Sequence, residues 1–157
     1  MENEKFILVI ADGSKEMEVA LKYACARSKK TNRKIMIVTF IEPLDVLTTQ
    51  GVTEIMQNEA RDEAEKKLQY ASSVVKESTG TVPVLHVKEG EIIQELKNLI
   101  NEEKNINVLV LAANVEESQK DPGPIINSLV NKELSNFRIP IMIVPGNFSS
   151  EHIALIT

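Results

Sequence analysis

Five short apolar segments, separated by longer stretches with helical spacing, constrain the fold of this chain more than any other feature. They are rich in Ile, Val and Leu, mostly without alternation of apolar and polar residues, and they cover residues 6–11, 35–41, 82–87, 108–113 and 139–144. Continuous apolar strands are typical of parallel sheets that helices cover on both faces. The order of segments predicts a single α/β domain over residues 1–157, with an open, doubly wound, five-stranded parallel sheet and right-handed crossovers.

The helical segments show their own start signals. Ser14 is expected to cap the first helix, Glu91 to begin the third and Pro124 to open the fourth. A short last helix is predicted over residues 152–156. The second helix is the longest, and its apolar face comprises residues that recur at steps of three or four: Met56, Ala60, Ala64, Leu68, Ala71 and Val75.

In a sheet of this kind, ligands bind outside the carboxyl ends of the strands. The sequence places an acidic rim there, relieved by Lys15, Lys88 and Lys120, and its members are Asp12, Glu42, Glu89, Glu116 and Glu117. Such a rim repels a bare triphosphate and favours one only together with a divalent cation such as Mg²⁺. Unrelated surface carboxylates are the preferred explanation of the rim, so no metal site is predicted.

The chain carries few groups suited to catalysis. It has two histidines and one cysteine, and Gly13 is the only glycine directly after the first strand. The glycine-rich phosphate loop and the three-glycine dinucleotide fingerprint are both absent. The acids and the lysine of a phospho-acceptor receiver domain are also missing. No general base stands beside a nucleophile, so we expect no enzyme, with a hydrolase of nucleotide phosphates as the least favoured alternative.

Charge and composition exclude several further classes. The chain has 18 Lys and Arg against 23 Asp and Glu, a net charge of −5, which argues against a nucleic-acid partner. A single cysteine cannot form an internal disulfide, and no apolar run approaches the roughly 20 residues that cross a membrane. The first residues lack the positive charge that opens a signal peptide. These features predict a cytoplasmic protein without a membrane segment.

Two short segments admit both a structural and a ligand-binding interpretation. Gly13 permits a tight turn, while the Asp12 carboxylate could also accept hydrogen bonds from a ribose or an adenine amino group. The segment from Pro122 to Ser128 either only starts a helix or presents free amides, including that of Gly123, to an anion. Asp121 opposes the anion, because its carboxylate can cap the same donors.

Three remaining features are interpreted as structural. Cys25 lies among apolar residues of a helix and is expected to be a buried, inert thiol. His86 lies inside the third strand and is expected to be a satisfied core or edge histidine. The basic stretch of residues 27–34 is interpreted as a helix C-terminus and loop, since no aromatic residue accompanies it.

Between Phe6 and about Phe148 the sequence resembles the universal stress protein family. The resemblance rests on the apolar strand before Asp12-Gly13-Ser14, on Val87-Lys88-Glu89-Gly90, on the apolar fourth strand and on the closing Ile139-Pro140-Ile141-Met142-Ile143-Val144-Pro145-Gly146. The Pro122-Gly123-Pro124 segment and the Val144-Pro145-Gly146-Asn147 ending look most like an alphaproteobacterial subgroup. None of these motifs is catalytic.

The resemblance implies a Rossmann-like adenine nucleotide alpha hydrolase-like fold with strand order 3-2-1-4-5. It also implies a cytoplasmic homodimer joined through the last strand, from Ile139 to Val144. Family members that bind ATP carry Gly-x2-Gly-x9-Gly-Ser/Thr after the fourth strand. Here Ala112 and Val115 stand at the first two glycine positions, and only a two-residue insertion brings Asn127-Ser128 into register. All three glycines are missing.

The favoured hypothesis is therefore a non-enzymatic, dimeric stress-response protein that acts on protein clients. The alternative is a switch that binds ATP or AMP, with Mg²⁺ if a triphosphate binds, in the crevice at the carboxyl ends of strands 1 and 4. Binders of the family contact adenine through the backbone at the position of Phe40. The candidate ligand-binding residues are Asp12, Gly13, Ser14, Phe40, Ala112, Val115, Gly123, Asn127 and Ser128.

Overall fold

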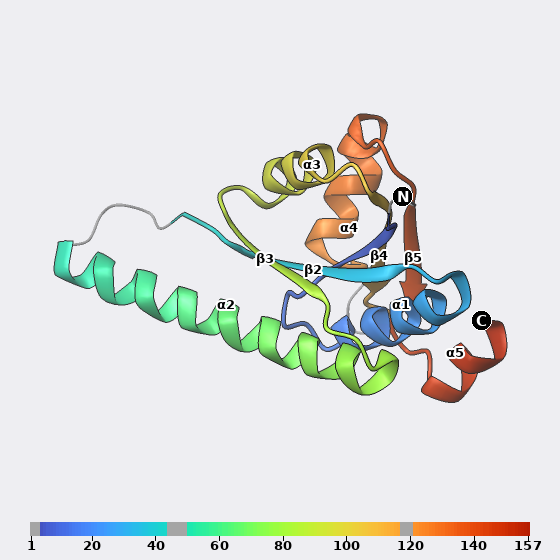
Figure 1. Cartoon of the computed structure of the whole chain (residues 1–157). Helices are drawn as coiled ribbons and strands as arrows, with labels where there is room; N and C mark the ends of the chain where they lie inside the picture. The colour runs from blue at the N-terminus through green and yellow to red at the C-terminus, as the bar shows by residue number, and fades with distance from the viewer. Residues whose placement is uncertain (1–3, 44–49, 117–120) are drawn as a thin grey trace.

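Strands and helices alternate along the chain as the apolar segments predict (Figure 1). The computed structural model describes residues 4–43, 50–116 and 121–157. Its elements are β1 (Phe6–Ile10), α1 (Met17–Thr31), β2 (Lys34–Ile41), α2 (Gln50–Thr79), β3 (Val84–Glu89), α3 (Ile92–Glu102), β4 (Ile106–Ala113), α4 (Pro124–Ser128), β5 (Ile141–Pro145) and α5 (Ser150–Ile156). After α4 the chain continues through a π-helical turn (Leu129–Glu133) and a 3₁₀ turn (Leu134–Asn136). No helix in the described residues is long and apolar enough to cross a membrane.

The five strands form one sheet in the order β3-β2-β1-β4-β5, and every pairing is parallel. This confirms the predicted fold class and strand order. The last strand begins at Ile141 rather than Ile139, because Pro140 has no N–H to donate to the ladder; its carbonyl accepts from Leu109 N–H at 3.1 Å. The third strand likewise starts later than expected, at Val84 after Pro83.

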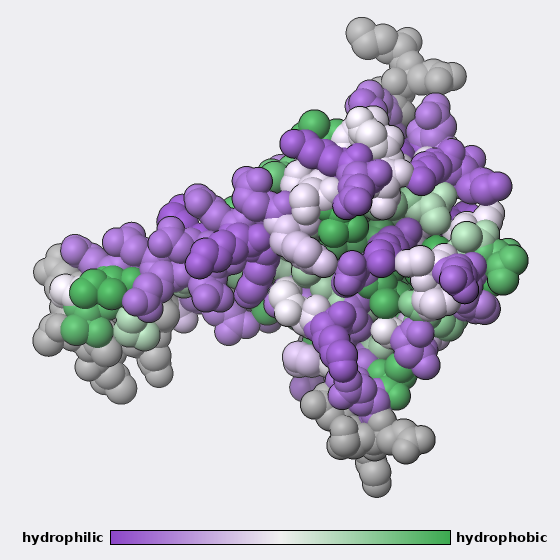
Figure 2. Space-filling model, turned by 90° about the horizontal axis from the view of Figure 1, so that it is seen from below, coloured by the Kyte–Doolittle hydropathy of each residue, from purple (hydrophilic) through white to green (hydrophobic). Residues whose placement is uncertain are grey.

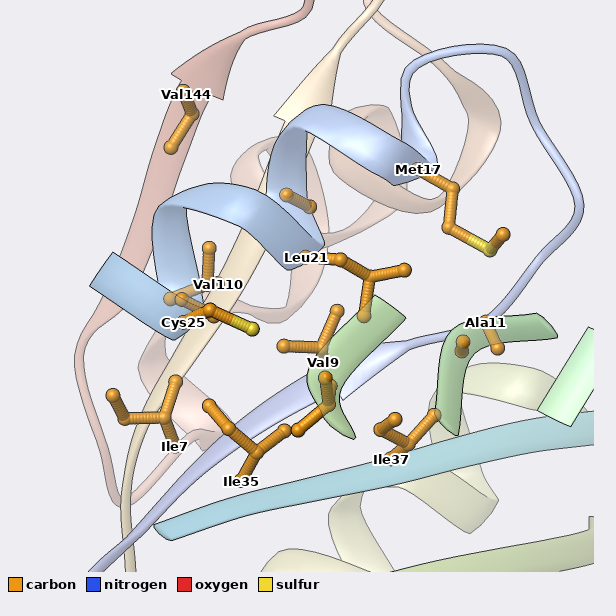
Figure 3. Packing of buried hydrophobic residues seen from close by; sticks show 14 of the residues in the cluster. Ile7, Val9, Ala11, Met17, Leu21, Cys25, Ile35, Ile37, Val110 and Val144 are labelled. Carbon is orange, nitrogen blue, oxygen red and sulfur yellow. The ribbon is translucent and has the colours of Figure 1, made fainter. Parts of the chain in front are cut away.

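Helices cover the sheet on both faces, with α1, α2 and α5 on one side and α3 and α4 on the other (Figure 1). Successive side chains of a strand point to opposite faces of the sheet, so alternate residues pack into two hydrophobic cores, one on each face. Ile7, Val9 and Ile37 pack with Leu21 of α1 on the first face (Figure 3). The second core lies under α3 and α4 and includes Leu8, Met36, Val38, Leu96, Leu99, Ile100, Leu109 and Leu129. Burial on both faces explains why these strands are continuous apolar runs.

The helix α2 extends past the body of the domain. Its 30 residues are about 45 Å long. The buried side chains of its apolar face begin at Ala64. Its first turns expose Val52, Ile55 and Met56 by 46%, 59% and 39%. Figure 2 shows the helix projecting from the body, with hydrophobic residues gathered at its free end. The apolar face of the helix is therefore exposed at Met56, because this end of the helix projects past the strands of the sheet (Figure 1).

Candidate functional site

The turn from β1 into α1 holds the first candidate residues. Asp12 Oδ1 accepts a hydrogen bond from Ser14 N–H at 2.9 Å, and Gly13 has a φ of +75°. A Cβ at Gly13 would lie 2.9 Å from Cε of Lys67 on α2, so this position combines a left-handed turn with a close approach. The carboxylate of Asp12 is thus already used once by its own turn, although it is exposed and retains further acceptor capacity.

The prediction that Ser14 caps α1 is wrong. The helix begins at Met17, and its N-cap residue is Glu16, whose side chain makes no capping bond. Ser14 takes part through its backbone instead, since its carbonyl accepts from Met17 N–H at 3.2 Å. The two-residue turn that Asp12 and Gly13 impose moves the helix start beyond the reach of the Ser14 hydroxyl.

The start of α4 is closed by the side chain of Asp121. Its Oδ1 accepts from Gly123 N–H and from Asn127 Nδ2, both at 3.0 Å. Gly123, with a φ of +125°, is the N-cap residue, and the helix behind it is only five residues long. The Asn114 N–H donates to the Pro122 carbonyl at 3.0 Å and so ties this segment to the end of β4. A fixed carboxylate at the helix start disfavours a second anion there.

A cavity of about 330 Å³ lies between the carboxyl ends of β1 and β4, the start of α1 and the start of α4. Most of its lining is apolar, and Met17, Ile92 and Ile125 are among its walls. We call it the crevice. The sequence reasoning missed Met17 and Ile92; both are apolar residues in the first turn of a helix at this edge of the sheet, which is the signal that could have identified them.

The crevice collects some of the predicted ligand-binding residues and not others. Asp12, Ser14, Ala112 and Gly123 line it. The remaining candidates do not line it: Gly13, Phe40, Val115, Asn127 and Ser128. A position in a family pattern fixes the segment of the chain but not whether a residue faces the crevice.

Two of the displaced candidates have clear alternative environments. Phe40 on β2 packs against the core under α3. Val115 is exposed and lines a separate cavity of about 200 Å³ together with Lys15 and Gly146. A Cβ at Gly146 would stand 2.4 Å from the carbonyl oxygen of Ala113, so the backbone at the end of β5 is packed directly on the end of β4.

The acidic rim is present at the carboxyl ends of the strands, and two of its described members form ion pairs. Glu116 pairs with Lys15 at 2.9 Å, and Glu89 pairs with Arg61 of α2. The hydrogen bond to Glu116 and the charge of that carboxylate raise the pKa of Lys15 above its ordinary value. Among the described residues, no group of three His, Cys, Asp or Glu could hold a metal ion. Glu117 and Lys120, two further residues assigned to this region, lie outside the described residues.

Cys25 and His86 are the remaining residues of chemical interest. Cys25 is buried and points into the core beside α1 (Figure 3). Burial raises the pKa of its thiol to about 11, against the opposing effects of Ser78 and Lys29, as expected for an inert thiol. His86 lies on the edge strand β3, but its Nε2 is buried without a hydrogen-bond partner among the described residues, so the expectation of a satisfied histidine is wrong.

Comparison with known proteins identifies the fold and the family. The model of the universal stress protein family matches residues 5–145. A search of curated proteins found no significant match. Among solved structures, the universal stress protein UspA from Lactobacillus plantarum has a TM-score of 0.73 at 12% identity, covering 92% of this chain and 99% of that one.

Two further structures contain adenine nucleotides. A universal stress protein in complex with cAMP has a TM-score of 0.65 at 20% identity, covering 93% of this chain and 100% of that one. A universal stress protein from Archaeoglobus fulgidus in complex with dAMP has a TM-score of 0.64 at 14% identity, covering 92% and 99%. These identities show a shared fold alone. Because the family model spans most of the sequence, the chain belongs to the universal stress protein family.

Proposed function

We propose that this protein is a cytoplasmic stress-response regulator that works by protein interaction, without catalysis and without conventional ATP binding. The observation that carries the proposal is the set of residues at the end of the crevice near α4, where binders of the family would hold the phosphates. Ala112 and Val115 stand where binders of the family have glycine, and the Asp121 carboxylate, which accepts from Gly123 N–H and Asn127 Nδ2, places a negative charge at the start of α4. A triphosphate there would meet a fixed carboxylate and would lack the close backbone approach that glycine allows.

The direct test is to identify what the purified protein carries. The protein is denatured, and the small molecules that it releases are analysed by mass spectrometry; we expect no stoichiometric adenine nucleotide. Calorimetric titration with Mg-ATP and with AMP should then show no heat of binding. Stoichiometric ATP after denaturation, or a micromolar dissociation constant for Mg-ATP, would contradict the proposal.

The second candidate function is binding of a nucleotide with a small phosphate part. The crevice, at about 330 Å³, has apolar walls suited to an adenine ring, and Asp12 and Ser14 lie at its mouth to meet a ribose. Relatives of the same fold have been solved with cAMP and with dAMP. A micromolar signal with AMP and none with Mg-ATP would select this function over the first. Binding of a triphosphate would require Mg²⁺ to offset the acidic rim.

The proposal includes a homodimer joined through the last strand. Within the part of the chain that the structure describes, β5 pairs only with β4, so its outer edge has no strand partner there. Its side chains alternate between the core and the surface: Val144 is buried, while Ile143 exposes 41% of its surface. An apolar edge of this kind favours a second copy of the same strand as a cover. Membership of the alphaproteobacterial subgroup stays a prediction from the proline-containing segments.

A further inference from the structure

A second large cavity lies at the end of the sheet opposite the crevice. Its volume is about 640 Å³, and it opens at the amino ends of β1, β2 and β4, beside the last residues of α1 and α2. We call it the amino-end cavity. No function follows from the family match for this region, and whatever the crevice binds has no bearing on it.

Positive charge is concentrated around the amino-end cavity. Four cationic side chains line it against a single carboxylate, in a chain whose net charge is −5. The carboxylate, Glu4, is paired with Lys34 at 2.9 Å. The side chains of the other three cations, Lys5, Lys29 and Arg33, make no hydrogen bond or ion pair with any described residue. Uncompensated cations that converge on one cavity favour an anionic ligand.

Basic residues at a helix C-terminus can also serve only to stabilise the helix end. The end of α1 is satisfied without them. The Ser28 carbonyl accepts from Asn32 N–H and from Arg33 N–H, and the Arg27 carbonyl accepts from Thr31 Oγ1 at 2.7 Å. Neither the Lys29 ammonium nor the Arg33 guanidinium is used to hold the last turn, and both are free to bind a ligand.

A polar group of the cavity constrains the ligand further. Oδ1 of Asn107, near the start of β4, is buried and has no donor among the described residues. A buried carbonyl oxygen without a donor is unfavourable, and a ligand hydroxyl would satisfy it. Inorganic phosphate has the negative charge that the cations bind. At neutral pH, however, it matches this acceptor less well than a sugar hydroxyl beside a phosphate does.

We propose that the amino-end cavity binds a small phosphorylated metabolite that carries hydroxyl groups. Lys5, Lys29 and Arg33 bind its phosphate, and Asn107 accepts a hydrogen bond from a hydroxyl group next to it. Arg33 is the residue best suited to bidentate contact with phosphate oxygens. The site takes its ligand at the positive end of the domain, away from the carboxylates of the acidic rim.

The test is calorimetric titration of the full chain with ribose 5-phosphate and with inorganic phosphate, at fixed ionic strength. We expect saturable binding of both, tighter for ribose 5-phosphate. The double substitution Lys29→Gln with Arg33→Gln should weaken binding at least about tenfold, because two charge-assisted contacts to the phosphate are lost. The matched control, Lys66→Gln with Lys132→Gln, removes the same charge away from the amino-end cavity and should leave the affinity unchanged.

A second variant tests the role of the buried oxygen. Asn107→Ala should reduce the affinity for ribose 5-phosphate to that for inorganic phosphate, while the melting profile confirms that the variant is folded. The proposal is overturned if neither probe binds at millimolar concentration, or if the two double variants weaken binding equally. It is also overturned if Ile125→Trp, which fills the crevice, abolishes binding and the Lys29 and Arg33 changes do not.

Discussion

The carboxylate of Asp121 is predicted to hold the start of α4, and its removal gives a measurable loss of stability. In Asp121→Ala the hydrogen bonds from Gly123 N–H and Asn127 Nδ2, both 3.0 Å long, disappear together. Both donors lie in an exposed segment and can turn to water, so the loss equals that of a helix cap, about 1–2 kcal/mol. For a chain of 157 residues this lowers the melting temperature by about 2–8 °C.

Thermal unfolding followed by circular dichroism at pH 7 measures this loss, and Asp121→Asn is the matched control. Asparagine keeps an acceptor oxygen at the same place but removes the charge, so its melting temperature should fall by less than that of the alanine variant. If Asp121→Ala melts with the wild type, the carboxylate does not hold the helix start. The Asp121 carboxylate would then not be fixed at the helix start, and it would no longer count against a phosphate at this end of the crevice.

Three other substitutions or reagents test separate parts of the structure. Ile143→Lys places a charge on the outer edge of β5 and should shift the mass measured by light scattering from dimer toward monomer; a wild type that is already monomeric refutes the interface. Gly146→Ala forces a Cβ to 2.4 Å from the Ala113 carbonyl and should cost about 1–3 kcal/mol in denaturant unfolding. Gly51→Ala, in a helix with nothing within 4 Å of the new atom, is its control and should be neutral or stabilising. Burial raises the pKa of the Cys25 thiol from 9.0 to about 11, so the thiol should resist a thiol reagent at pH 8 until the protein unfolds. The contribution of the buried neutral thiol to the free energy of unfolding should be lost as the pH rises from about 9 to 11. Rapid labelling of the folded protein at pH 8 would contradict this.

The central part of the fold follows from the sequence because its strands are buried on both faces. β1, β2 and β4 lie within two residues of the apolar segments that predict them. Helix α2 shows the limit of this reasoning. Its spacing predicts the helix and its apolar face, but the burial of Met56 depends on how far the sheet extends beneath it, and periodicity contains no such information.

The candidate site was predictable by segment and not by side chain. The rule for strand ends in parallel sheets correctly brings Asp12 and Ala112 to one crevice. Local capping preferences then assign Ser14 to the helix, whereas the structure gives its N–H to Asp12. Both the expected cap and this bond involve only neighbouring residues, and they use different groups of Ser14, the hydroxyl oxygen and the N–H. The structure shows the bond and begins the helix at Met17, which leaves the Ser14 hydroxyl without a capping role.

The same topology explains why a net charge of −5 describes this protein poorly. In a parallel sheet all strands have their carboxyl ends at the same end of the sheet. Acids that follow different strands therefore gather there, as Asp12, Glu89 and Glu116 do. Residues at or before the starts of strands gather at the opposite end of the sheet, where Lys5, Arg33 and Lys34 lie. The net charge disfavours nucleic acid as a partner, but the fold separates the charge into two ends. The acidic end disfavours an unaccompanied triphosphate in the crevice, and the basic end is where the chain can receive an anion.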